Sequence, residues 1–194
     1  MHVYWDQAFI TPLLERVKSG SLDKTERRQN LRVTCLSPAA AFLEARGCPK
    51  EYSPDGRLPT LYDYDRLESF PLSRMRGSMT RLGPVTELLA DCDDRFVIFG
   101  PGEEVSVNFD AASLPALPVG WNRSFVLRTW GYCKDASPFT QSGDTIEPLP
   151  FRGMKDYPYG RDEHYPQDRP HQEYQRIYNT RELKLQGETP RHGR

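Results

Sequence analysis

The residues of this chain that could do chemistry are aromatic side chains next to carboxylates and amides. Near the start of the sequence, Trp5 and Asp6 stand beside Gln7. An aromatic face beside such polar groups is one way in which proteins grip a pyranose ring, so this triplet is a candidate sugar platform. The structural alternative is that Trp5 is a core residue and that Asp6 lies at a strand edge.

Further candidates lie in the second half of the chain, where tryptophans, tyrosines and one glutamate occur among prolines and glycines. An exposed row of such aromatic side chains would suit a carbohydrate or a flat protein surface. The candidate ligand-binding residues are Trp5, Asp6, Trp121, Trp130, Tyr132, Glu147, Tyr157 and Tyr159.

Clustered acidic residues suggest a cation site only weakly. Asp91, Asp93 and Asp94 supply enough oxygens for calcium, but the twelve-residue spacing and glycine of an EF-hand are missing. The favoured interpretation is a turn that ends a helix, and the sequence predicts no metal site.

Catalytic patterns are weak throughout the sequence. The histidines are His2, His164, His171 and His192, and they show no HExxH spacing and no neighbouring nucleophile motif. Asp144 and Glu147 could meet as an acid and base pair, but any chain with 27 acidic residues offers such pairs. We therefore predict no catalytic residue and no cofactor, and a hydrolase is the third and least favoured class.

The four cysteines, Cys35, Cys48, Cys92 and Cys133, form no CxxC pair that would suggest zinc or a redox dithiol. Half-buried unpaired thiols are the favoured interpretation. A disulfide such as Cys35 to Cys48 is the alternative in an extracellular protein, and the sequence does not set the connectivity.

The composition of the chain argues against several classes of binding partner. The 194 residues carry a formal net charge of −1, so electrostatics gives no case for nucleic acid or an acidic membrane. No apolar run approaches the ~20 residues of a membrane span, and the N-terminus lacks the pattern of a signal peptide. Seventeen prolines argue against an all-helical protein, because helix interiors tolerate proline badly.

The periodicity of the first half predicts strands separated by loops. Residues 2 to 10 are aromatic and β-branched and read as a strand, and residues 31 to 35 alternate as a half-buried strand does. Between them, Thr11 as an N-cap and Pro12 at the first helical position predict one or two helical turns. Residues 53 to 83 read as a long ordered loop with short extended pieces.

The second half offers clearer elements. We expect a short helix at residues 84 to 90, a β-hairpin at 95 to 109 around a "GPGE" turn, and another strand at "RSFVLRTWGY". Residues 171 to 183 can form a terminal helix with Tyr174 and Tyr178 on one side. Residues 182 to 194 are expected to be a disordered basic tail.

Together these elements predict a mainly β chain. We expect an antiparallel β-sandwich, jelly-roll-like, with long proline-rich loops and a few short helices. Residues 1 to 181 are expected to form a single β-rich domain.

The stretch "GDTIEPLPFRGMKDYPYG", residues 143 to 160, raises a separate question. Its three prolines exclude a helix interior or a central strand, yet it is rich in apolar and aromatic side chains. Because proline restricts the unfolded chain, ordering such a loop costs little entropy. It can cover the core, which is the favoured interpretation, or it can present a rigid aromatic surface to a partner.

Several stretches together resemble a known family. These are "YWDQ", "YDYD", "DDRFVIFG", "GDTIEPLPF" and "YNTR", and the similarity runs from about Val3 to Arg181. The chain resembles the C-terminal region of bacterial FG-GAP repeat proteins with an ASPIC/UnbV domain, which are sometimes fused to tetratricopeptide repeats.

This resemblance implies an exported multidomain protein, extracellular or periplasmic, in which a β-rich module follows a propeller and an ASPIC/UnbV domain. The function it implies is a non-catalytic interaction or assembly module, whose partner is those upstream domains or another protein. Carbohydrate binding through exposed aromatic residues is the alternative.

The chain itself carries no propeller repeat and no signal peptide, so we interpret it as a C-terminal fragment of a larger protein. The strand at residues 2 to 10 is then expected at an open sheet edge, where unpaired backbone groups would promote self-association.

Overall fold

The computed structural model describes residues 2–16, 31–52, 58–68, 76–135 and 139–183. Within them the named strands all pair antiparallel, and the α-helix is α2 (Arg169–Tyr178). The predicted class, mainly β with antiparallel sheets and few helices, is confirmed, whereas the sandwich and the jelly-roll remain predictions. The strands are β1 (His2–Arg16), β2 (Leu31–Val33), β3 (Ala40–Ala45), β4 (Cys48–Glu51), β5 (Tyr62–Glu68), β6 (Gly77–Met79), β7 (Gly83–Pro84), β8 (Val97–Phe99), β9 (Glu103–Asn108), β10 (Trp121–Lys134) and β11 (Arg181–Leu183).

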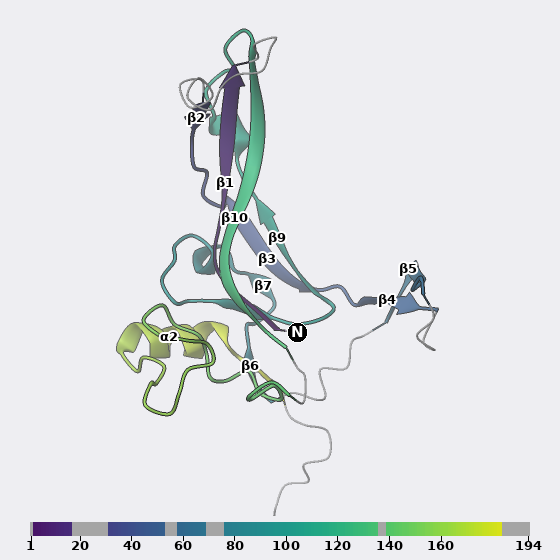
Figure 1. Cartoon of the computed structure of the whole chain (residues 1–194), viewed down its shortest axis with the longest axis vertical. Helices are drawn as coiled ribbons and strands as arrows, with labels where there is room; N and C mark the ends of the chain where they lie inside the picture. Colours follow the sequence, from purple (N-terminus) through teal and green to yellow (C-terminus); the bar gives the residue numbers. More distant parts are fainter. Residues whose placement is uncertain (1, 17–30, 53–57, 69–75, 136–138, 184–194) are drawn as a thin grey trace, which may run out of the picture.

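The longest feature is a ribbon made of β1 and β10, which runs out beyond the rest of the molecule (Figure 1). The two strands pair from His2 with Lys134 to Arg16 with Trp121, with one register shift between Trp5 and Gln7. The helical turns predicted after Thr11 are therefore wrong. The local helix signals are overridden because pairing with β10 satisfies this backbone over its whole length.

Strand β1 has strand neighbours on both sides along part of its length. On the side away from β10 it pairs with β8 near its start, where Tyr4 lies opposite Ile98, and with β2 near its end, where Leu14 lies opposite Arg32. The expected open edge is therefore wrong for Val3 to Trp5, whereas residues 7 to 10 have β10 as their strand partner on one side.

The predicted hairpin at residues 95 to 109 is right in its strands and wrong in their pairing. Strand β8 pairs with β1, whereas β9 pairs with β3 from Ala40 opposite Asn108 to Ala45 opposite Glu103. A tight turn does join them, with the Glu103 amide donating to the Gly100 carbonyl at 3.1 Å. Alternation identifies a strand and its buried face, but it does not identify the partner strand.

Shorter elements complete the described chain. The predicted helix at residues 84 to 90 is reduced to a 3-10 turn, η2 (Thr86–Leu88), and a second such turn is η3 (Ala111–Ser113). The terminal helix is confirmed as α2, but it ends at Tyr178. The chain then re-enters a sheet as β11, which pairs with β6, so the predicted disordered tail does not begin at Glu182. Residues 184–194 lie outside the described part.

Strands β4 and β5 form a two-stranded arm at one side of the molecule (Figure 1). The alternating "YDYD" stretch begins β5, which confirms an extended piece within the segment expected to be a loop. Residues 53–57 and 69–75 of that segment lie outside the described part.

The core is gathered at the base of the ribbon, among β3, β6, β8, η2, α2 and the loop of residues 143 to 160. Ile146, Leu149 and Tyr159 of that loop are no more than 8% exposed, so the predicted core cover is confirmed. The buried core cluster comprises Ala41, Leu43, Met79, Val85, Leu88, Leu89, Phe96, Val97, Ile98, Ile146, Leu149, Tyr165, Tyr174 and Tyr178.

Candidate functional site

The structure does not bring together Trp121 and Trp130, two of the candidate ligand-binding residues. Trp121 begins β10 and Trp130 lies nine positions later, so they point to opposite faces of the strand and stand roughly 30 Å apart. The guanidinium of Arg32 lies over the Trp121 ring at 5.0 Å, which is a cation–π contact. Trp130 is 52% exposed.

The three predicted tyrosines lie against the core. Tyr132 packs on Phe96 and on Tyr157, with ring centroids 5.9 and 5.4 Å apart. The hydroxyls of Tyr157 and Tyr159 donate to the carbonyls of Pro148 and Leu149, at 3.0 and 3.1 Å. These rings anchor the proline-rich loop and form no exposed row with Trp130.

Trp5 and Asp6, the first two candidate residues, lie at an irregularity of β1. Trp5 is opposite Gly131 on one side and Val97 on the other, and the register shift falls at Asp6. A β-bulge of this kind re-aims side chains. The structure describes the backbone of these two residues, and their side chains lie outside what it describes.

Glu147 is exposed and sits above a buried lysine. Its carboxylate accepts a hydrogen bond from the Thr145 hydroxyl at 3.0 Å, and its backbone carbonyl accepts from Lys134 Nζ at 2.9 Å. Lys134 is 2% exposed, and its Nζ also donates to the Thr145 carbonyl at 2.8 Å. Burial lowers the pKa of Lys134 to about 8, against the opposing influence of Glu147 and Asp144.

The ribbon exposes apolar side chains that the sequence did not predict to be exposed. Phe125, Val126, Leu127 and Trp130 are between 42% and 55% exposed on β10. Neighbouring residues in a strand point to opposite faces, so the apolar side chains occupy both faces of the ribbon. We call these four residues the ribbon patch. The alternation of the sequence predicted the strand, but burial depends on what covers it, which a strand pattern cannot reveal.

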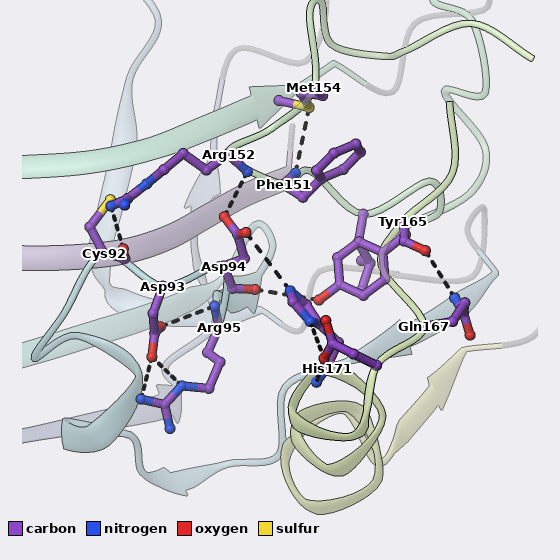
Figure 2. Close-up of polar contacts among 12 residues, drawn as sticks. Cys92, Asp93, Asp94, Arg95, Phe151, Arg152, Met154, Tyr165, Gln167 and His171 are labelled. Atoms are coloured by element: carbon purple, nitrogen blue, oxygen red, sulfur yellow. Dashed lines mark hydrogen bonds and ion pairs between the residues drawn. The ribbon is translucent and has the colours of Figure 1, made fainter. Parts of the chain in front are cut away.

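A second unanticipated feature is a polar cluster at the start of α2 (Figure 2). Asp94 has a positive φ of 66°, and its carboxylate accepts from the Arg152 amide at 2.7 Å. Its other oxygen lies 3.8 Å from His171 Nε2, while His171 Nδ1 lies 2.7 Å from the carboxylate of Asp168. The hydrogen bond from His171 lowers the pKa of Asp168.

This cluster joins three distant segments. Asp168 is the N-cap of α2, where its carboxylate accepts from the His171 amide at 3.1 Å. Tyr165 packs edge-on against His171, and burial, followed by the charge of Asp94, raises the pKa of its phenol. An N-cap aspartate with proline in the first turn was the available sequence signal for this helix start.

The cluster holds an oriented histidine. His171 Nε2 is buried and has no hydrogen-bond partner among the described residues, and the nearest charged group is a carboxylate. The hydrogen bonds and ring packing of the cluster join the 91 to 95 turn, the proline-rich loop and α2, and we call this arrangement the clasp. The turn itself agrees with the interpretation preferred for Asp91, Asp93 and Asp94.

Two shallow pockets flank α2. One, of about 570 Å³, is lined by residues of the clasp and of η2, including Glu87, Arg95, His171 and Tyr178. The other, of about 410 Å³, lies on the opposite side of the helix and includes Glu147.

Comparison with known proteins adds no relative. No family model, no curated protein and no solved structure matches this chain. No helix in the described part of the chain is long and apolar enough to span a membrane. Within the same residues, no three His, Cys, Asp or Glu side chains converge as a metal-binding group would, and no disulfide links the four cysteines.

Proposed function

We propose that the protein is a non-catalytic interaction or assembly module, and that its binding surface is the ribbon patch. The observation that supports this most is the exposure of Phe125, Leu127 and Trp130 on a ribbon that projects from the body of the molecule. Phe125 and Leu127 share one face of β10, and Trp130 lies on the other. Isolated apolar residues are common at surfaces, but neighbouring ones on a protruding element are typical of a protein-binding site. Aromatic and aliphatic anchors of this kind carry most of the energy in protein interfaces.

The partner we propose is a propeller or ASPIC/UnbV-type domain, as the family resemblance implies, in an extracellular or periplasmic setting. Charge supports a partner with acidic groups at the rim of its contact surface. From Trp121 to Cys133, β10 contains Arg123 and Arg128 and no acidic residue. An apolar centre flanked by arginines favours a surface that offers carboxylates around an apolar patch.

Binding to purified propeller and ASPIC/UnbV-type domains, measured by biolayer interferometry, tests this proposal. We expect the double variant Phe125→Ser, Leu127→Ser to weaken binding at least about tenfold, because both side chains would lose buried apolar area. Since both residues are already about half exposed, the fold should be retained.

The matched control is the double variant Leu117→Ser, Val119→Ser, which changes two exposed apolar residues outside the strand. It should bind as the wild-type chain does. Equal binding by the ribbon variant, or no binding of any such domain at roughly 100 μM, would contradict the proposal.

A further inference from the structure

The pocket on the Glu147 side of α2 has the features of a small-molecule site. Its volume of about 410 Å³ falls within the range of ligand pockets. Its walls come from β6, the proline-rich loop and one face of α2. They expose polar and apolar surface in similar amounts, and their polar groups are hydroxyl, amide, carboxylate and guanidinium groups. The lining residues are Ser78, Glu147, Leu149, Gln172, Gln175, Arg176 and Asn179.

Asn179 contributes a buried donor that is not used within the described chain. The residue is 8% exposed and follows the last turn of α2, and its Oδ1 accepts from the Thr80 hydroxyl at 3.2 Å. The Thr80 hydroxyl itself accepts from the Ile98 amide at 2.8 Å. In the recorded orientation of the amide, the single hydrogen of this hydroxyl points at Oδ1. Nδ2 is left without a partner among the described residues, which is costly for a buried donor.

Glu147 contributes an acceptor whose position is fixed. Its Oε2 accepts from the Thr145 hydroxyl at 3.0 Å. Gly77 lies beside it with a φ of +112°, and a Cβ at Gly77 would stand 2.6 Å from Oε2. Glycine at this position therefore lets the carboxylate approach β6 closely. Because the other carboxylate oxygen has further lone pairs, the group can accept from a ligand as well.

The helix side of the pocket adds groups of both kinds. Gln172 donates through Nε2 to the Gln167 carbonyl at 2.8 Å, which leaves its Oε1 as an acceptor. Arg176 is 73% exposed at the pocket rim and offers donors. The charges of Arg176 and Glu147 oppose one another, so the lining favours a neutral ligand over an anion or a cation.

We propose that this pocket binds a neutral polyhydroxylated ligand, such as a monosaccharide unit. A ring with vicinal hydroxyls both donates and accepts, so it can donate to the Glu147 carboxylate and accept from Asn179 Nδ2, which is buried and would reach the pocket through a rotation of its side chain. Leu149 offers an apolar contact for the C–H face of such a ring. The site shares Glu147 with the candidate ligand-binding residues predicted from the sequence, but it uses amides in place of tryptophans, and it is independent of the ribbon patch.

Ligand-observed NMR and calorimetry on the full chain test this site. The probes are the methyl glycosides of glucose, galactose, mannose and N-acetylglucosamine, and myo-inositol, with inorganic phosphate and acetate as charged comparisons. We expect millimolar or tighter binding of at least one neutral probe. Asn179→Ala and Glu147→Gln should each weaken it about tenfold.

Arg176→Ala is the variant that keeps the test decisive if Asn179→Ala does not fold, because Arg176 is exposed. It should also weaken binding, by about three- to tenfold. Glu104→Gln and Arg46→Ala make the same chemical changes on β9 and next to β3, away from the pocket, and should leave affinity unchanged. The proposal is overturned if the folded protein binds no neutral probe, if it prefers phosphate or acetate, or if the pocket variants bind as tightly as the controls.

Discussion

At the scale of single residues, Lys134 shows how one buried cation holds the proline-rich loop. Its ammonium donates to successive carbonyls of that loop, at Thr145 and Glu147, with a longer contact of 3.4 Å to Ile146. Three carbonyls replace water around the charge, but they do not replace it fully, and this is why the pKa falls to about 8. The residue ends β10 and fixes where the loop begins.

Stability is expected to depend on pH through this lysine. An unfolded lysine titrates near pH 10.4, so between about pH 8 and 10 the unfolded chain binds more protons than the folded one. The free energy of unfolding should therefore rise with pH across this window, on the order of 2 kcal/mol. Below about pH 8 this lysine is protonated in both states, so its contribution no longer changes with pH. Urea denaturation under reducing conditions from pH 7 to 9.5 measures it.

Lys134→Met should remove this rise, since methionine has no proton to lose. The raised pKa values of Tyr165 and Tyr178 act in the opposite direction, but above about pH 10, where unfolded tyrosines ionise. An identical slope in the variant and the wild-type chain would show that Lys134 is not the titrating group.

At the scale of elements, the loop of residues 143 to 160 behaves as a part of the core without being a strand. Ile146 is fully buried, and Tyr159 is both buried and hydrogen-bonded. The loop is clasped to the rest of the molecule through Arg152 and through the packing of Phe151 on Tyr165. Aromatic content combined with proline thus indicates a rigid cover.

Truncating Ile146 tests this role. Ile146→Ala should lower the free energy of unfolding by about 2–4 kcal/mol, because it removes buried methyl groups and leaves a cavity. Phe139→Ala changes a larger residue that is 99% exposed, and it should alter stability by less than about 0.5 kcal/mol. Chemical denaturation of both variants measures these changes. Equal effects on the free energy of unfolding would show that burial of the loop does not stabilise the core.

How far the sequence predicts these elements depends on the kind of information involved. Local periodicity located β10, β8 and α2, because burial on one face leaves a pattern in the chain. It could not predict that β8 pairs with β1, or that Thr11 and Pro12 continue a strand, because long-range pairing decides both. Likewise the clasp around His171 joins segments whose proximity only the fold creates.

At the scale of the whole molecule, the body and the ribbon differ in how much of their apolar side chains is exposed. The body encloses the core cluster, whereas the ribbon holds Phe125, Leu127 and Trp130 in the open. Strands β8 and β2 cover the start and the end of β1 on the side away from β10, so we expect these side chains, more than the backbone of β1, to drive self-association. The predicted self-association therefore remains, with a different physical cause.

Sedimentation velocity measures this prediction. The isolated chain should self-associate at roughly 10–100 μM, because no partner covers the ribbon patch. Leu127→Lys should shift it towards the monomer by placing a charge in the patch. Val119→Lys adds the same charge at a fully exposed residue outside the strand and should have no effect. A wild-type chain that stays monomeric throughout would refute the prediction.

The pairing of β1 with β10 also sets the order of events when the chain folds. Every partner of β1 in β10 lies more than 100 positions later in the sequence. Closing so long a loop costs conformational entropy before the hydrogen bonds of the strand pair form. Proteins dominated by such long-range contacts fold slowly. During synthesis β1 leaves the ribosome long before β10 exists, so it must wait without its main partner. The ribbon can therefore form only after β10 has been made, and until then β1 lacks its main partner.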